Sequence, residues 1–128
     1  MSYHFSKIVP YNFDEAVARV TQELSKEGFG IVTEIDIKET FKKKINVDFR
    51  NYRILGACNP HFAYQAINAE DKIGTMLPCN IVVQEHEEGK VEVTAVDPVA
   101  SMMAIKNEQL GQLAVEVQQK LKNVIANL

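Results

Sequence analysis

The chain has 128 residues, of which 46% are hydrophobic and 24% are charged, and its formal net charge at pH 7 is −3. This length predicts a single domain over residues 1–128 with a substantial core, and the acidic balance argues against nucleic acid as a partner. No apolar stretch approaches the ~18 residues that cross a bilayer, so we expect no membrane association. Two cysteines do not make a disulfide scaffold, which favours a reducing, cytoplasmic location.

Hydrophobic patterning divides the chain into nine segments. Strand-like segments alternate apolar and polar side chains, and they predict strands at residues 2–9, 29–36, 50–57, 76–86 and 90–96. Apolar stripes at helical spacing predict helices at residues 13–24, 38–45, 60–68 and 107–127, the second of them short and basic at best. In the first two strands we expect one inward-facing side, formed by Tyr3, Phe5, Val9, Phe29, Ile31, Thr33 and Ile35.

The resulting order is β-α-β-α-β-α-β-β-α. Because the strands alternate and are not uniformly apolar, we expect an α+β fold, a mainly antiparallel sheet with helices on one face. The face of the sheet without helices would be exposed to solvent or covered by a partner. An apolar surface of that kind normally signals association, so we expect a homodimer.

Two short motifs hold both cysteines, each beside an asparagine and a proline: Cys58-Asn59-Pro60 and Pro78-Cys79-Asn80. Asn-Pro is a helix-start signal, so Asn59 should cap a helix with its side-chain oxygen and Pro60 should take the first helical position. Cys58 would then lie at a helix N-terminus, where free N–H groups favour a thiolate. If the third and fourth strands are neighbours, both cysteines meet at one end of the sheet.

Three interpretations of the cysteines remain open at this point. They could form a ligand-binding or thiol redox site, or they could be small apolar residues of the core, because cysteine is often buried. Zinc is the third alternative, because His61 and His86 follow the two cysteines. However, positions 79 and 86 are an odd number of residues apart and fall on opposite faces of a strand, so we expect no metal.

Motifs of known catalytic chemistry are missing from the sequence. There is no glycine-rich phosphate loop, no nucleophile elbow and no His-Glu-x-x-His, so we expect no cofactor and leave open whether the protein is an enzyme. Asp97 could act as a general acid or base, but its position before Pro98 favours a helix cap.

The segments Tyr52–Pro60, Leu77–Val83 and Ala95–Pro98 resemble the domain of unknown function 302 family of bacteria and archaea. The resemblance also includes Gly28-Phe29-Gly30 and covers nearly the whole chain. It implies an α+β fold similar to the TATA-binding-protein-like architecture, often as a homodimer, and no assigned reaction.

By this resemblance, the family's signature positions are Cys58, Pro60, Pro78, Cys79, Asn80, Asp97 and Pro98. Fold does not carry function, so the similarity to a DNA-binding architecture does not imply DNA binding. The expected function is a dimeric module that binds a small ligand or a protein at the cysteine motifs, and the alternative is a thiol-based redox enzyme or sensor.

Overall fold

The computed structural model describes residues 2–128, which form one five-stranded sheet and five α-helices. The strands are β1 (His4–Val9), β2 (Gly30–Asp36), β3 (Tyr52–Cys58), β4 (Cys79–Glu85) and β5 (Val91–Val96). The helices are α1 (Phe13–Lys26), α2 (Ile37–Ile45), α3 (Pro60–Ala69), α4 (Pro98–Ser101) and α5 (Glu108–Ala126). Two 3-10 turns complete the order, η1 (Ile73–Met76) and η2 (Glu87–Gly89).

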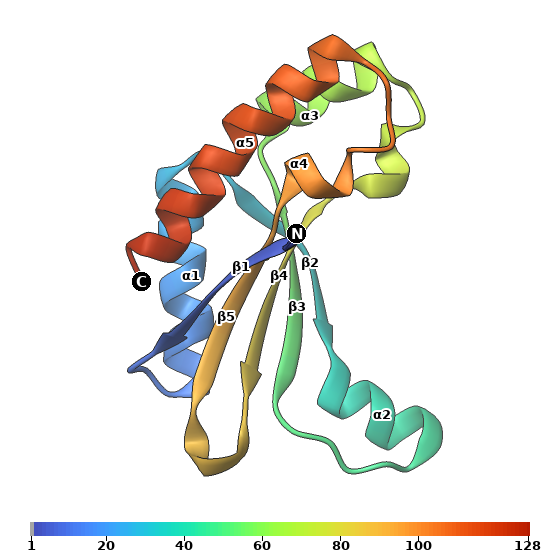
Figure 1. The fold of residues 1–128 in the computed structure, drawn as a ribbon. Coiled ribbons are helices and arrows are strands. Elements are labelled where there is room, and N and C mark those ends of the chain that lie inside the picture. Colours follow the sequence, from blue (N-terminus) through green and yellow to red (C-terminus); the bar gives the residue numbers. More distant parts are fainter. Residues whose placement is uncertain (1) are drawn as a thin grey trace.

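All neighbouring strands are antiparallel, and their order across the sheet is β1-β5-β4-β3-β2. The expected α+β fold is therefore confirmed. Helices α1 and α5 lie together on one side of the sheet, whereas α3 and α4 lie at one end of it and α2 projects from the other end (Figure 1). None of the helices within residues 2–128 has the length and apolarity needed to cross a membrane.

The helix-covered face of the sheet carries the main core. Alternate side chains of β4 and β5 are almost fully buried there, including Ile81, Val83, Val93 and Ala95. They pack against the apolar stripes of α1 and α5. A smaller cluster of Ala66, Ile73, Leu110 and Leu113 joins α3 to the first turns of α5, and Phe62 contacts both clusters.

No helix formed by residues 2–128 covers the opposite face of the sheet. Ile35 is 45% exposed on this face, with Ile54 and Val82 half-buried in the row beside it, and Ile8 is 52% exposed on the β1 edge opposite Glu92. We call this surface the open face. Toward its β1 edge a hydroxyl pair, Ser6 on β1 and Thr94 on β5, shares a 2.9 Å hydrogen bond. Burial on one side and exposure on the other explain the alternation of the sequence.

Two expectations about inward-facing residues were wrong. In β2 the register shifts between Ile31 and Thr33, so Ile31 pairs with Ala57 on the covered face while Ile35 pairs with Ile54 on the open face. An extra residue at a β-bulge moves all later side chains to the other face, which strict alternation does not foresee. Tyr3 precedes β1 and is 69% exposed.

The helix starts were mostly predicted correctly. Asn12 and Asn107 each accept a hydrogen bond from the backbone N–H three residues on, at 2.9 Å and 3.1 Å. Gly28, at φ +85°, follows the end of α1 in the left-handed conformation that glycine tolerates. The fourth strand starts later than expected, at Cys79, because residues 73–76 coil into η1 and Pro78 lacks the N–H for a ladder bond.

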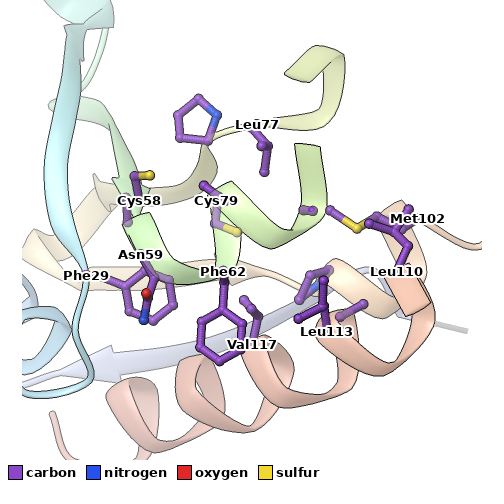
Figure 2. Close-up of a pocket in the computed structure, with 16 residues that line it drawn as sticks. Phe29, Cys58, Asn59, Phe62, Leu77, Cys79, Met102, Leu110, Leu113 and Val117 are labelled. Carbon is purple, nitrogen blue, oxygen red and sulfur yellow. The ribbon is translucent and has the colours of Figure 1, made fainter. Parts of the chain in front are cut away.

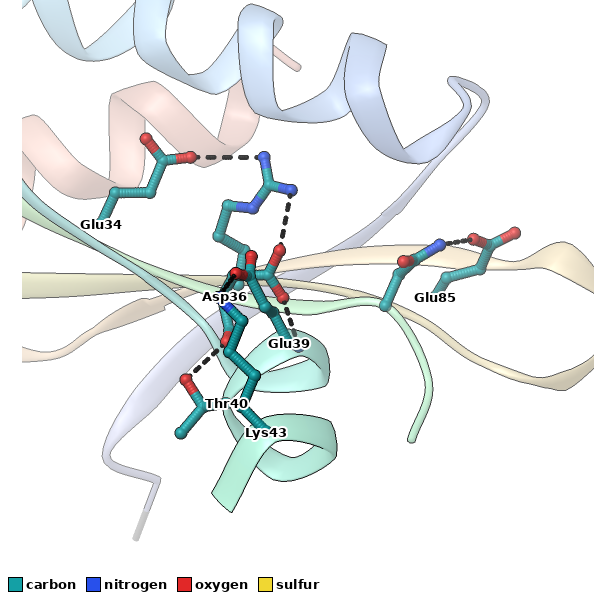
Figure 3. Close-up of polar contacts among 8 residues, drawn as sticks. Glu34, Asp36, Glu39, Thr40, Lys43 and Glu85 are labelled. Atoms are coloured by element: carbon teal, nitrogen blue, oxygen red, sulfur yellow. Dashed lines mark hydrogen bonds and ion pairs between the residues drawn. The ribbon is translucent and has the colours of Figure 1, made fainter. Parts of the chain in front are cut away.

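Helix α2 is tied to the sheet by its capping residue Asp36 and by aromatic contacts of Phe41 with Phe49 and of Phe49 with Tyr52 of β3, and not by a buried face. The Arg53 guanidinium lies 3.2 Å from a Glu34 carboxylate oxygen and 3.6 Å from one of Asp36, and Asp36 also accepts the Glu39 backbone N–H at the start of α2 (Figure 3). No residue of α2 is buried. The helix is therefore an appendage of the β2–β3 edge rather than part of the core.

Candidate functional site

A small cavity lies between the two core clusters, where β3 and β4 meet α3, α4 and α5. Its volume is about 40 Å³, and on this measure one water molecule needs about 10–15 Å³. Apolar side chains form most of its wall (Figure 2): Phe29, Phe62, Ala63, Ala66, Leu77, Met102, Leu110, Leu113, Ala114 and Val117. We call it the inner cavity. It has room for a short chain of a few atoms.

Both cysteines are among the residues that line the inner cavity. Cys79 opens β4, and its neighbour across the ladder is Ala57, one residue before Cys58. The Cys79 side chain is buried, and this burial, with a smaller contribution from Cys58, raises the pKa of its thiol to about 11. Cys79 is therefore a neutral thiol in the cavity wall at pH 7.

The two thiols do not face each other. Ala57 and Cys79 are ladder partners and share the covered face, so alternation directs Cys58 to the opposite side of β3. In Figure 2 the Cys79 sulfur points toward Phe62, whereas the Cys58 sulfur points away from it. Cys58 is half-buried, and neither cysteine is in a disulfide. The cysteines are near each other in the fold without forming a facing pair.

Asn59 does not cap α3 with its side chain, so that expectation was wrong. Its amide nitrogen instead donates to the Glu27 backbone carbonyl at 3.3 Å, across the turn that joins α1 to β2. A Cβ on Gly28 would lie 2.9 Å from the same nitrogen, so the side chain passes close over this turn. Orienting the nitrogen toward Glu27 turns the oxygen away from the N–H groups of the helix.

The Asn59 side-chain oxygen is the one polar feature of the inner cavity wall that lacks a partner among residues 2–128. The residue is only 8% exposed, and Oδ1 is buried without a hydrogen-bond donor. Most buried polar groups are bonded, because an unpaired one costs about 1–3 kcal/mol. Asn59 lies beside Phe29 in the wall of the cavity (Figure 2), so the unpaired acceptor is close to this end of the cavity.

The proline of the second motif packs against the glycine of β3. A Cβ on Gly56 would lie 2.6 Å from the Pro78 ring and 2.0 Å from the Thr33 hydroxyl oxygen. Only glycine leaves room for Pro78 there, and Pro78 follows a cis peptide bond. Asn80, the ladder partner of Gly56, is exposed on the open face and does not line the inner cavity.

The remaining predicted site residues have structural roles. Pro60 occupies the first turn of α3, as expected. Asp97 caps α4 by accepting from Val99 and Ala100, and it also accepts from the Gln118 side chain at 3.0 Å. The helix-cap interpretation of Asp97 is confirmed. Its carboxylate is held by these donors and is not part of either cavity wall.

The four side chains considered for zinc are separated. His86 lies beyond the far end of β4 from Cys79, where its ring is 3.0 Å from Glu92, and His61 is exposed on α3. Among residues 2–128, no three or more His, Cys, Asp or Glu side chains are grouped so that they could hold a metal ion.

A second hollow adjoins the inner cavity on the side of η1 and α4. It measures about 180 Å³ and shares Leu77, Pro78, Cys79 and Met102 with the inner cavity. We call it the outer hollow. Its remaining wall is mixed in polarity and consists of Thr75, Met76, Asn80, Val96 and Ser101.

Sequence reasoning found the cysteine motifs but missed the cavity that they border. The helix patterns had marked Phe62 and Leu113 as core residues, and nothing in their spacing distinguished a cavity wall from a filled core. Met102 lies between the short helix α4 and α5, in a segment with no clear periodicity. The cavity arises from the way α3, α4 and α5 meet, which is a property of the tertiary structure.

Comparison with known proteins agrees with this architecture. The profile of the family described as "Domain of unknown function DUF302" matches residues 5–128. A crystal structure of an uncharacterized conserved DUF302 protein from Bacillus stearothermophilus is similar with a TM-score of 0.90 and 25% sequence identity, covering 98% of each chain. No curated protein matches. The chain therefore belongs to the DUF302 family.

Proposed function

We propose that this protein is a binding module for a small, mostly apolar molecule that enters the inner cavity and donates one hydrogen bond to Asn59 Oδ1. The cavity wall supplies apolar contact, and the asparagine supplies the single directional contact. This combination is typical of small-molecule sites, in which an apolar lining surrounds a few polar groups. The ligand would carry one hydroxyl or N–H at the end of a short apolar segment.

One observation carries this proposal: a nine-tenths buried asparagine that lines an apolar cavity has a side-chain oxygen with no donor among residues 2–128. If the residue at this position had only a structural role, an apolar side chain would give a more stable protein, because the unpaired Asn59 oxygen is unfavourable. A ligand that donates to the oxygen removes that cost when it binds. The site would select against similar molecules that lack a donor.

A thiol-based redox role has less support. A dithiol reaction needs two sulfurs that can meet, but the ladder register directs Cys58 of β3 and Cys79 of β4 to opposite faces of the sheet. The buried Cys79 thiol, with its pKa raised to about 11, is also a poor nucleophile at neutral pH. We assign Cys79 to the cavity wall in this proposal.

We also propose that two copies associate through the open face. Most of its strand positions are apolar or neutral, with Ile8, Ile35, Ile54 and Val82 among them. Its charged groups lie toward one end, where Glu92 is bonded to His86 and Arg50 is bonded to Gln84. Depletion of charge is characteristic of the centre of a protein–protein interface. A second copy would cover the apolar side chains that no helix covers.

The binding proposal is tested with two isomers, 1-butanol and methyl propyl ether. They contain the same atoms, but only the alcohol can donate. We expect the alcohol to bind about fivefold more tightly or better, since a net hydrogen bond contributes about 1 kcal/mol. Titrations followed by backbone amide NMR shifts give both affinities and place the perturbed residues around the cavity.

A filled cavity provides the control. Ala63→Leu adds bulk to the cavity wall and should abolish binding, whereas Ala18→Leu, at an exposed position of α1, should leave it intact. Equal binding of the two isomers, or binding that survives Ala63→Leu, would contradict the proposal.

A further inference from the structure

The two adjoining cavities have no charged side chain in their walls. Within residues 2–128, neither the inner cavity nor the outer hollow is lined by Lys, Arg, His, Asp or Glu. Charged groups are common elsewhere, since 24% of the chain is Asp, Glu, Lys or Arg. A carboxylate, phosphate or ammonium group in either space would lose hydration without gaining an opposite charge, which is unfavourable.

Polarity is distributed along the two spaces in a definite order. The inner end has the Asn59 acceptor, the middle is apolar, and the outer hollow adds the Thr75 and Ser101 hydroxyls and the Asn80 amide. The Asn59 end and the Met102 end lie on opposite sides of the cavity (Figure 2). A bound molecule that spans both spaces would meet polar, apolar and polar surroundings in turn.

Met102 and Leu77 belong to the walls of both spaces. Methionine is unbranched and has three rotatable bonds, so a change of rotamer moves its thioether at low cost. Met102 follows the four-residue helix α4 and is only half-buried. It is suited to act as the movable part of the partition between the inner cavity and the outer hollow.

We infer that the ligand of this site is an uncharged molecule that is polar at both ends. Its inner end is a hydroxyl or N–H that donates to Asn59 Oδ1, its middle is a short unbranched apolar chain, and its outer end is a neutral hydrogen-bonding group in the outer hollow. This inference rests on the proposed function and adds the chemical class of the ligand. Carboxylates and amines of the same length are excluded.

The test compares three probes with the intact protein by NMR titration: 1-butanol, 4-hydroxybutanamide and 4-hydroxybutanoate. The amide should bind at least as tightly as 1-butanol and perturb residues of both spaces. The carboxylate should bind about tenfold more weakly than the amide or worse, because its charge finds no partner.

A charge placed in the outer hollow should change this preference. Thr75→Lys adds a cation to the wall and should improve the affinity for 4-hydroxybutanoate, so that it equals or exceeds that for the amide. Thr21→Lys is the matched control, since both threonines are exposed and both hydroxyls donate to a backbone carbonyl, at 3.0 Å and 2.8 Å. The control should not change the preference.

The outcomes separate the two proposals. If 1-butanol binds in the inner cavity but the amide binds more weakly than 1-butanol, or no better than the carboxylate, the ligand class is wrong and the binding function stands. An effect of Thr75→Lys no larger than that of Thr21→Lys would equally overturn the ligand class. If 1-butanol itself does not bind, the proposed function fails and the ligand class falls with it.

Discussion

Replacing Asn59 by leucine should stabilise the protein while it removes ligand binding. Leucine has the same branched arrangement of four side-chain heavy atoms as asparagine, so the substitution replaces the amide by two methyl groups without changing the length of the side chain. It removes the 3.3 Å hydrogen bond to the Glu27 carbonyl and the buried acceptor that has no donor in the described chain. The two changes act on stability in opposite directions.

The magnitudes favour stabilisation. The lost hydrogen bond contributes about 0.5–1.5 kcal/mol, and relief of the unpaired buried oxygen is worth about 1–3 kcal/mol. The difference is a net gain of about 1 kcal/mol in the free energy of unfolding. For a domain of this size, that gain raises Tm by about 3–6 °C.

Urea denaturation and thermal melting measure the effect, and Asn107→Leu provides a matched comparison. Asn107 is also partly buried, but both ends of its amide are bonded, to the Leu110 N–H at 3.1 Å and to the Ala69 carbonyl at 3.0 Å. Its replacement should therefore destabilise the protein by about 2 kcal/mol. A loss of more than about 1 kcal/mol on Asn59→Leu would refute the reasoning, because Oδ1 would then not be an unpaired group.

Three further predictions concern packing, thiol reactivity and assembly. Gly56→Ala should lower the free energy of unfolding, measured in urea, by about 1–3 kcal/mol because the new Cβ would meet the Pro78 ring. Gly111→Ala should raise it by up to ~1 kcal/mol, because Gly111 has open space around it and a helical backbone. Equal effects of the two substitutions would contradict the packing argument. Iodoacetamide should modify Cys58 much faster than Cys79 at pH 8, because burial raises the pKa of Cys79 to about 11. The rate at Cys79 should keep rising as the pH approaches 11. Similar rates at pH 8 in single-cysteine variants would show that Cys79 is accessible and would contradict the prediction. Light scattering at micromolar concentration should give a dimer mass that Ile54→Lys on the open face reduces to that of a monomer, and a monomeric parent protein would exclude the proposed association.

Local signals were sufficient to predict most of the fold. The helical stripes of α1 and α5, the caps at Asn12 and Asp97, and the alternation of β4 and β5 all depend on residues close in sequence. The β-bulge in β2 was not predictable in this way, since Ile31, Thr33 and Ile35 alternate as regularly as in an unbroken strand. Pairing with β3 decides where the extra residue is placed.

The candidate site was predictable only in part. The motifs placed Cys58 and Cys79 at the same end of the sheet on the condition that the third and fourth strands are neighbours, which the pairing of β3 with β4 fulfils. The role of Asn59 was missed, since its amide has two alternatives, the N–H groups of α3 and the Glu27 carbonyl, and only the three-dimensional position of the α1–β2 turn decides between them. The outer hollow depends on the same kind of long-range arrangement.

A crystal structure of the protein soaked in 1-butanol tests the central claim most directly. The account predicts the butanol hydroxyl oxygen at about 2.5–3.0 Å from Asn59 Oδ1, with the chain along Phe62 and toward Met102. Butanol bound elsewhere, or an inner cavity in which an ordered water remains on Oδ1 in the presence of butanol, would contradict it.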